Sequence, residues 1–401
     1  MQPIALEHGR FTGAGGAALL ASAAAAQFVL IGEEHGFAEP ADVTRALVEA
    51  LRPQGRRYLI AEIGPLAAAD IERLARAGDR DAWSDLYRRA PFSVPFFWFI
   101  EDIAMAEAAV DGAADDVPLI WGIDQEFMLS PSLHFAALRE RAADADTRAF
   151  VDALDAADRA AFRTLTETRD PAAAALTLAG APPFAELRAR FAGDPDALAR
   201  IEALADSHAI YALFHAGRGF DNNLERARLM KRLLRERLQA TSEGPGAARL
   251  IGKFGANHVQ RGHTPMGILD IGTFLAELAA WNGNTSFHLL VLPVGGARNQ
   301  VLPFTGPEAA AVPVSCTDLG AYAPLCAAAG EVRGWQYVDL AALRPRRSAL
   351  ARQDPALAEL VLGFDAVLFV GGAQPATMVP GNLAALNETA DRSPAAEQPE
   401  L

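Results

Sequence analysis

Short apolar runs alternate along most of the chain with longer stretches in which apolar residues recur at helical spacing. The short runs predict buried strands, and the stretches between them predict helices. Because strands that alternate with helices form parallel sheets, the pattern predicts an α/β fold with a mainly parallel sheet and crossover helices. The predicted strands are residues 28–31, 58–61, 118–121, 249–254, 287–293, 336–340 and 366–370.

An apolar stretch rich in alanine, residues 15–26, lies directly before the first predicted strand. It has the length of a signal-peptide core, but Glu7 is acidic and no Lys or Arg precedes Arg10. We therefore expect a helix that packs on the first strand, and a second helix at residues 41–51. No run of about 18 strongly apolar residues occurs, so no membrane-spanning helix is predicted.

The long segment between the third and fourth predicted strands has helical periodicity and almost no strand signal. Breakers at Asp170-Pro171 and Pro182-Pro183 divide it into several helices. We interpret it as a long all-helical insertion, which forms either a lid over a pocket or an extra packing layer. The predicted organisation is an N-terminal part of the α/β domain (1–130), the helical insertion (131–245), a C-terminal part of the α/β domain (246–386) and a flexible tail (387–401).

The composition indicates a folded chain, because 51% of the 401 residues are hydrophobic. Lys and Arg number 36 against 50 Asp and Glu, which gives a formal charge of −14. This acidic balance counts against nucleic acids and anionic membrane surfaces as partners. Two cysteines, Cys316 and Cys326, are too few for a disulfide framework or a Cys-based zinc knuckle. They fit a reducing compartment. A cytoplasmic location is expected because no targeting or membrane signal is found, and the oligomeric state is not fixed by the sequence.

Polar side chains follow four of the predicted strands, at the point where each strand ends. Because the carboxyl ends of parallel strands meet at one edge of a sheet, we expect these side chains to lie close together. Two histidines and one or two carboxylates suit a divalent metal such as Zn, Mn, Co or Fe, and they also suit acid–base chemistry without a metal. The residues are Glu33, Glu34, His35, Glu62, Asp124, Asn257 and His258.

These positions also carry a family resemblance. The chain resembles the superfamily that groups erythromycin esterases with the Tiki, TraB and ChaN-like haem-binding proteins. The shared pattern is a Gly-x-x-His after one strand, a Glu after the next strand, and a later Gly-x-x-His. Here these are Gly32 to His35, Glu62, and Gly255 to His258. The first copy, GEEHG, resembles most closely the erythromycin-esterase form.

Further segments show the same resemblance. Residues 226–230 (RARLM) are similar to an Arg-x-x-x-Met element of the erythromycin esterases, and HVQRGHTPMGILDIGTFL, from His258, is similar to a later pattern. Macrolide esterases usually have another His three residues before the final one, where this chain has Gly255, so the second copy is closer to the Tiki and ChaN-like form. The resemblance implies hydrolysis of an ester, amide or peptide, with a small molecule or a peptide as substrate.

Two versions of the chemistry remain open. With a metal, His35, Glu62 and His258 hold the ion, and Glu33 or Glu34 takes a proton from the bound water. Without one, His35 is the general base, Glu62 orients it, and His258 stabilises the oxyanion. The alternatives to a hydrolase are a haem- or iron-binding ChaN-like protein and a catalytically silent interaction module.

Some residues outside the strand ends are further candidates. Arg226 or Arg228 is expected to stabilise an oxyanion or to pair with Glu62, and the alternative for both is the exposed, charged face of the same Arg-rich helix. His208 and His215 lie two helical turns apart, which allows a ligand pair or ordinary packing. Aromatic residues at 92–99 predict either a pocket wall or a buried helix start.

Overall fold

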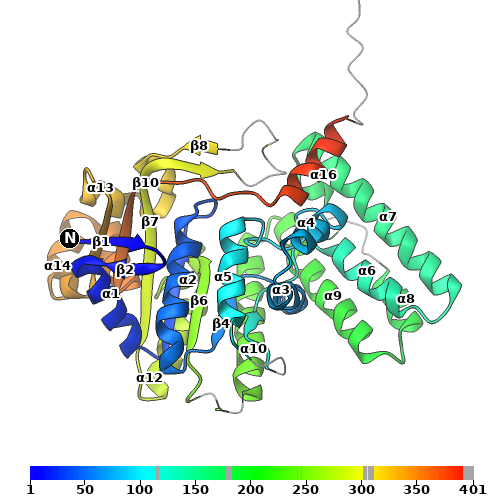
Figure 1. Ribbon diagram of the computed structural model, residues 1–401, viewed down its shortest axis with the longest axis horizontal. Helices are drawn as coiled ribbons and strands as arrows, with labels where there is room; N and C mark the ends of the chain where they lie inside the picture. The colour runs from blue at the N-terminus through cyan, green and yellow to red at the C-terminus, as the bar shows by residue number, and fades with distance from the viewer. Residues whose placement is uncertain are drawn as a thin grey trace, which may run out of the picture.

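The computed structural model describes residues 1–113, 117–174, 176, 183–241, 243–244, 246–300, 305 and 311–391. Within these residues one sheet runs through the molecule in the order β2-β1-β9-β10-β7-β3-β6-β4-β5, and β8 pairs with β7 (Figure 1). The strands are β1 (Gln2–Glu7), β2 (Arg10–Thr12), β3 (Phe28–Glu33), β4 (Tyr58–Ala61), β5 (Ile120–Gly122), β6 (Leu250–Gly255), β7 (Ser286–Asn299), β8 (Ala311–Pro313), β9 (Trp335–Asp339) and β10 (Ala366–Ala373).

The centre of the sheet is parallel and its edge is antiparallel. Each neighbouring pair from β10 to β5 is parallel, whereas β9, β1, β2 and β8 pair antiparallel. The predicted α/β fold with a mainly parallel sheet is therefore confirmed, and all seven predicted strands are present. The sequence pattern missed β1, β2 and β8, because these short peripheral strands are largely exposed and lack a continuous apolar run.

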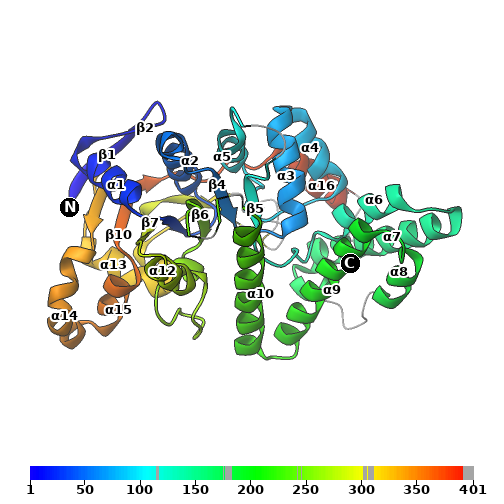
Figure 2. The same ribbon diagram turned by 90° about the horizontal axis from the view of Figure 1, so that it is seen from below.

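Helices cover both faces of the sheet (Figure 2). On one face α2 packs against α5, and α5 against α3, while α12 packs against β7 on the other. The alanine-rich stretch forms α1, which lies against β1. The helices of this layer arrangement are α1 (Gly13–Ala25), α2 (Glu39–Leu51), α3 (Pro65–Ala77), α4 (Arg80–Arg89), α5 (Ile100–Val110), α11 (Ala256–Val259), α12 (Ile271–Trp281), α13 (Ala323–Ala329), α14 (Arg347–Gln353), α15 (Pro355–Gly363) and α16 (Pro380–Asp391).

The described residues between β5 and β6 form helices and their connecting loops. Helices α6 to α9 gather beyond the β5 edge, away from the N-terminal hairpin (Figures 1 and 2), and share a hydrophobic cluster of their own. Helix α10 instead contributes Met230, Leu234 and Leu238 to the main core. The interpretation of residues 131–245 as an insertion stays a prediction. Its helices are α6 (Pro131–Arg141), α7 (Ala145–Thr168), α8 (Phe184–Arg190), α9 (Pro195–His215) and α10 (Gly219–Ala240).

Two features near the C-terminus differ from the sequence-based picture. Cys316 and Cys326 form a disulfide, so the two cysteines do not support the reducing compartment that their small number suggested. The predicted tail begins inside α16, which continues to Asp391, and residues 392–401 lie outside the described part of the chain. None of the described helices is long and apolar enough to cross a membrane.

Candidate functional site

A cavity of about 400 Å³ opens at the carboxyl edge of the parallel strands, under α9 and α10. Side chains from the ends of β3, β4, β5 and β6 form its polar floor, and aromatic and sulfur-containing side chains form its walls. The residues that line it are His35, Glu62, Pro95, Phe96, Asp124, Gln125, Phe127, Met128, Pro171, Tyr211, Phe214, His215, Asn222, Arg226, Gly255, Asn257, His258 and Met266.

His35 lies in the turn that follows β3, and its ring is held on two sides. Its Nδ1 is 2.9 Å from Oε1 of the buried Glu33, and its ring stacks on Phe96 at a centroid distance of 4.0 Å. In the described part of the chain Nε2 has no hydrogen-bond partner. A Cβ built on Gly255 would lie 3.0 Å from Nε2, so a side chain there would crowd the imidazole. Glycine at 255 therefore leaves space for Nε2 to face the cavity.

Behind Glu33 lies a buried row of alternating charges. Lys253 projects from the middle of β6, with Nζ 2.8 Å from Glu33 Oε1 and 3.1 Å from Asp102 Oδ1. All three side chains are almost fully buried. Burial alone would raise the pKa of Glu33, but Lys253 and His35 lower it below its ordinary value. Burial, only partly offset by Lys253, raises the pKa of Asp102 to about 7.

Glu62, the first residue after β4, connects three donors on the cavity floor. Its Oε1 accepts a hydrogen bond from Arg226 at 2.8 Å, and its Oε2 accepts one from the Gly255 backbone N–H at 2.6 Å. Arg226 also forms a bidentate pair with Asp124, including a 2.9 Å bond from Nε to Oδ1. Burial would raise the pKa of Glu62, but His258 and Arg226 hold it well below its ordinary value.

His258 lies on α11, a single helical turn that follows β6. Its Nε2 is 3.2 Å from Glu62 Oε1, and its Nδ1 is 2.8 Å from Oδ2 of Asp270, which is fully buried and also caps α12. Burial alone would lower the pKa of His258, but Glu62 and Asp270 outweigh it and raise the pKa to about 10. At neutral pH His258 is therefore an imidazolium with both N–H groups donated.

His35, Glu62 and His258 lie around one cavity, as expected, but the carboxylate that contacts His35 is not the expected one. Glu33, rather than Glu62, contacts the Nδ1 of His35. Glu33 is the last residue of β3, and Glu34 and His35 belong to the turn that follows, which brings His35 back onto Glu33. Glu34 is absent from the cavity lining.

The remaining candidate residues fall into two groups, those that line the cavity and those that lie outside it. Asp124 and Arg226 are on the cavity floor, and His215 lines the wall. Arg228 pairs with Glu225 on the exposed face of α10. His208 bonds the Leu176 carbonyl outside the cavity.

Sequence reasoning did not identify three residues that support the floor: Asp102, Lys253 and Asp270. A weak signal existed for two of them. Lys253 is a charge inside an otherwise apolar strand, and such a charge needs a buried partner. Asp270 precedes an apolar helix, which is the usual place of a capping residue. Asp102 has no comparable signal, because its contact with Lys253 joins two distant parts of the chain.

The donor atoms on this floor are engaged within the protein rather than arranged around a metal ion. Each oxygen of Glu62 accepts a hydrogen bond, and the protonated His258 has no free lone pair. Arg226 supplies the positive charge that a cation would otherwise provide. Among the described residues, no group of three or more His, Cys, Asp or Glu is placed so as to hold a metal ion. The metal version of the site stays a prediction, and no step below uses it.

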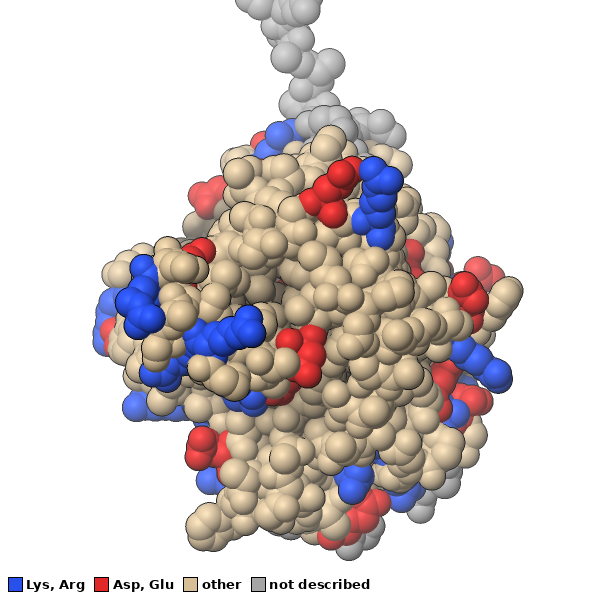
Figure 3. Space-filling view, turned by 90° about the vertical axis from the view of Figure 1, so that its left-hand side faces the viewer, with Lys and Arg blue, Asp and Glu red and all other residues tan. Residues whose placement is uncertain are grey.

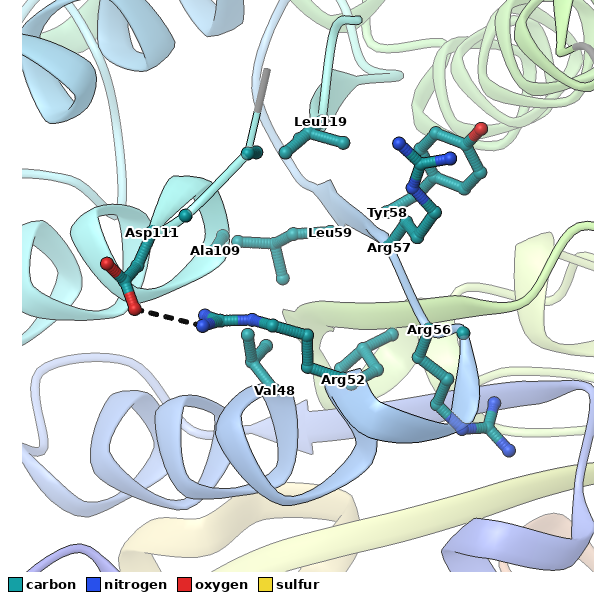
Figure 4. Close-up of a pocket in the computed structure, with 13 residues that line it drawn as sticks. Val48, Arg52, Arg56, Arg57, Tyr58, Leu59, Ala109, Asp111 and Leu119 are labelled. Atoms are coloured by element: carbon teal, nitrogen blue, oxygen red, sulfur yellow. Dashed lines mark hydrogen bonds and ion pairs between the residues drawn. The ribbon is translucent and has the colours of Figure 1, made fainter.

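A second cavity, of about 300 Å³, lies at the opposite end of the sheet, where β4 begins (Figure 4). Arg52 reaches across it to Asp111 at 3.0 Å, and Arg56 points away and bonds the backbone carbonyls of Ala23 and Gln27. None of the described residues that line it is a histidine or a cysteine. Its charges are satisfied within the protein, so it lacks the groups that acid–base chemistry needs.

The surface charge is uneven on one side of the molecule. Figure 3 shows basic side chains gathered on the left of the face that carries the N-terminal edge of the sheet, while acidic side chains are scattered between broad uncharged areas.

Comparison with known proteins gives a likeness in structure. No family model and no curated protein matches the sequence at a significant level. A mutant of the erythromycin esterase EreC, in its open conformation, is similar with a TM-score of 0.55 and 16% identity, over 91% of this chain and 95% of that one. A Bacillus cereus protein is similar with a TM-score of 0.52 and 13% identity, over 90% of this chain and 92% of that one.

A third solved structure, described as a succinoglycan biosynthesis protein, has a TM-score of 0.52 and 14% identity, over 90% of this chain and 91% of that one. Because all three likenesses extend over nine-tenths or more of each chain, they concern the complete arrangement of sheet and helices. The resemblance inferred from the sequence is confirmed at the level of the fold: this chain has an erythromycin-esterase-like fold.

Proposed function

We propose that this protein is a hydrolase in which His35, acting as a general base, activates a water molecule for attack on an ester carbonyl. The observation that carries the proposal is the state of the His35 ring. Its Nδ1 is held by the buried carboxylate of Glu33, and its Nε2 faces the cavity without a partner in the described part of the chain. A carboxylate that fixes one ring nitrogen and leaves the other free is the arrangement that orients a catalytic histidine.

The proton follows a short path in this proposal. Water gives a proton to His35 Nε2 as its oxygen forms a bond with the carbonyl carbon. The tetrahedral intermediate then expels the alcohol, which takes the proton back from His35 as the carbon–oxygen bond breaks. The carboxylic acid and the alcohol are the products.

The negative charge on the former carbonyl oxygen needs a nearby cation. His258 and Arg226 are the cations on the floor, and both are held in place by buried carboxylates. Fixed charges of this kind stabilise a developing oxyanion without reorganising. Glu62 lies between the two cations and keeps them at the cavity side of the sheet edge.

The structural comparison supports the same class of reaction. EreC, which has the same fold, is an erythromycin esterase. A cytoplasmic location, which the sequence-based picture included, is not needed by this proposal.

The proposal is tested with purified protein that carries no affinity histidines, dialysed against EDTA. We expect it to hydrolyse 4-nitrophenyl butyrate, with release of nitrophenol followed by absorbance. Absence of hydrolysis with esters and with anilide amides would contradict the proposal. Hydrolysis that appears only after Zn, Mn, Co or Fe is added would restore the metal version. A Soret band in the absorption spectrum would favour the haem-binding alternative.

The pH profile provides a second prediction. Burial would lower the pKa of His35, but Glu33 and Glu62 outweigh it and raise the pKa above the ordinary 6.5. Since the base must be neutral, we expect kcat/KM to fall as the pH falls through a pKa above 6.5. It should fall again near pH 10, where His258 loses its proton. Initial rates from pH 5 to 11 check this, and Glu33→Gln should move the acidic limb to lower pH.

A further inference from the structure

We propose that the substrate of this site is a neutral ester with an extended apolar group, which packs against Phe96, Met128 and Phe214. This inference rests on the proposed function and names its substrate class. It follows from two properties of the cavity: the charges on its floor are paired within the protein, and apolar side chains line its wall from His35 to the mouth, beside the polar Gln125, His215 and Asn222.

The pairing of the floor charges leaves no unbalanced charge for ionic recognition of a substrate group. Arg226 bonds Glu62 and Asp124 through Nε and Nη2, so two buried carboxylates balance its charge; it can stabilise an oxyanion that forms beside it, but it offers no excess positive charge to a carboxylate or phosphate. His258 donates both N–H groups to buried carboxylates. The carboxylates of Glu62, Asp124 and Asp270 are paired with these two cations, so they offer no unbalanced negative charge to an ammonium group. A charged substrate would therefore lose its hydration without gaining a partner.

The walls offer contacts of a different kind. Phe96, Phe127, Met128, Tyr211 and Met266 line the space above the floor. Phe96 has a backbone φ of 60°, a left-handed conformation that is rare for an aromatic residue. Such strain collects at functional sites, and here it places the ring flat against His35. The apolar wall thus begins directly beside the proposed base.

The mouth of the cavity continues this apolar surface into solvent. Phe214 lines the cavity and is 60% exposed, although it is a large hydrophobic side chain. Phe220, which is 58% exposed, lies beside Gly267 in the loop that also carries Met266. Exposed aromatic side chains at the rim of a cavity mark a surface that a ligand covers. A substrate that reaches from His35 to Phe214 would bury the Phe214 ring.

Binding of uncleavable probes tests this inference independently of hydrolysis. Isothermal titration would compare butan-2-one with octan-2-one, a neutral carbonyl compound with a longer chain. Each added methylene that is buried should strengthen binding about threefold. Octanoate and octylammonium have similar apolar chains but carry a charge, and we expect them to bind at least about tenfold more weakly than octan-2-one.

A pair of variants connects the binding to the cavity mouth. Phe214→Ser should weaken binding of octan-2-one about fivefold or more. Trp281→Ser is the matched control, because Trp281 is 87% exposed at the end of α12 and does not line the cavity. It should leave the affinity unchanged.

Equal affinity for the neutral and charged probes, or no dependence on chain length, would overturn the inference. An unaltered affinity in Phe214→Ser would also overturn it. If the ketones bind in the expected order and no ester is hydrolysed, the proposed function fails while the assignment of a neutral apolar ligand stands. If esters are hydrolysed but kcat and KM do not depend on chain length, the assigned substrate class is wrong while the proposed hydrolase function stands.

Discussion

Replacing Lys253 by methionine is expected to lower the free energy of unfolding by about 3–5 kcal/mol. The ammonium group lies between Glu33 and Asp102, and all three side chains are almost completely buried. Methionine has a similar length and fills much of the same volume, so the effect comes from the charge. Without Lys253, two carboxylates face each other in the core with no cation between them. Urea unfolding followed by circular dichroism measures the change.

The chain supplies its own control for this prediction. Lys231, the only other lysine, is partly exposed on α10 and donates a hydrogen bond to the Leu269 carbonyl. Lys231→Met should cost less than about 1 kcal/mol, as for other surface positions. If the two variants lose equal stability, the pairing of Lys253 with Glu33 and Asp102 does not stabilise the fold as predicted.

The second large effect is expected at Arg226. Changing it to methionine leaves the buried carboxylates of Glu62 and Asp124 without the cation that joins them. We expect a loss of about 3–5 kcal/mol in stability, and a fall of about a hundredfold or more in kcat/KM for 4-nitrophenyl butyrate, because a cation near the oxyanion is removed. Measuring kcat/KM at a temperature well below the unfolding midpoint of the variant separates the loss of activity from the loss of stability.

Arg228→Met is the matched variant for Arg226. It lies on the same helix two residues later, but its side chain is 63% exposed and pairs only with Glu225 in the described part of the chain. Its replacement should change stability by less than about 0.5 kcal/mol and leave the rate intact. If Arg228→Met lowers kcat/KM as much as Arg226→Met does, the overall positive charge of α10, and not the guanidinium paired with Glu62 and Asp124, supports the reaction.

The sequence predicted the parallel core of the sheet because buried strands are continuous apolar runs. It also predicted the meeting of Glu62 and His258, because the carboxyl ends of parallel strands share one edge. Glu33 ends β3 and Glu34 begins the turn, where strand alternation no longer applies, so the sequence could not separate the roles of the two carboxylates. The contact between Glu62 and His258 depends on short-range rules combined with a known topology.

Other contacts could not be read from the sequence. The approach of Asp102 to Lys253 depends on how α5 packs on β6, and the pairing of Asp124 with Arg226 depends on where α10 crosses the sheet edge. These contacts join residues about a hundred or more positions apart and have no periodic signature. The disulfide between Cys316 and Cys326 was missed because two cysteines ten residues apart give no spacing pattern that distinguishes a pair from free thiols.

The central claim is that His35 is the general base of a hydrolase, and hydrolysis of 4-nitrophenyl butyrate by wild-type protein, His35→Gln and His263→Gln tests it most directly. His263 is exposed and lies outside the cavity, so it is the matched histidine control. We predict that His35→Gln lowers kcat/KM by about 10²–10⁴-fold while His263→Gln matches the wild type. A His35→Gln variant that is folded and hydrolyses the ester at the wild-type rate would contradict the account.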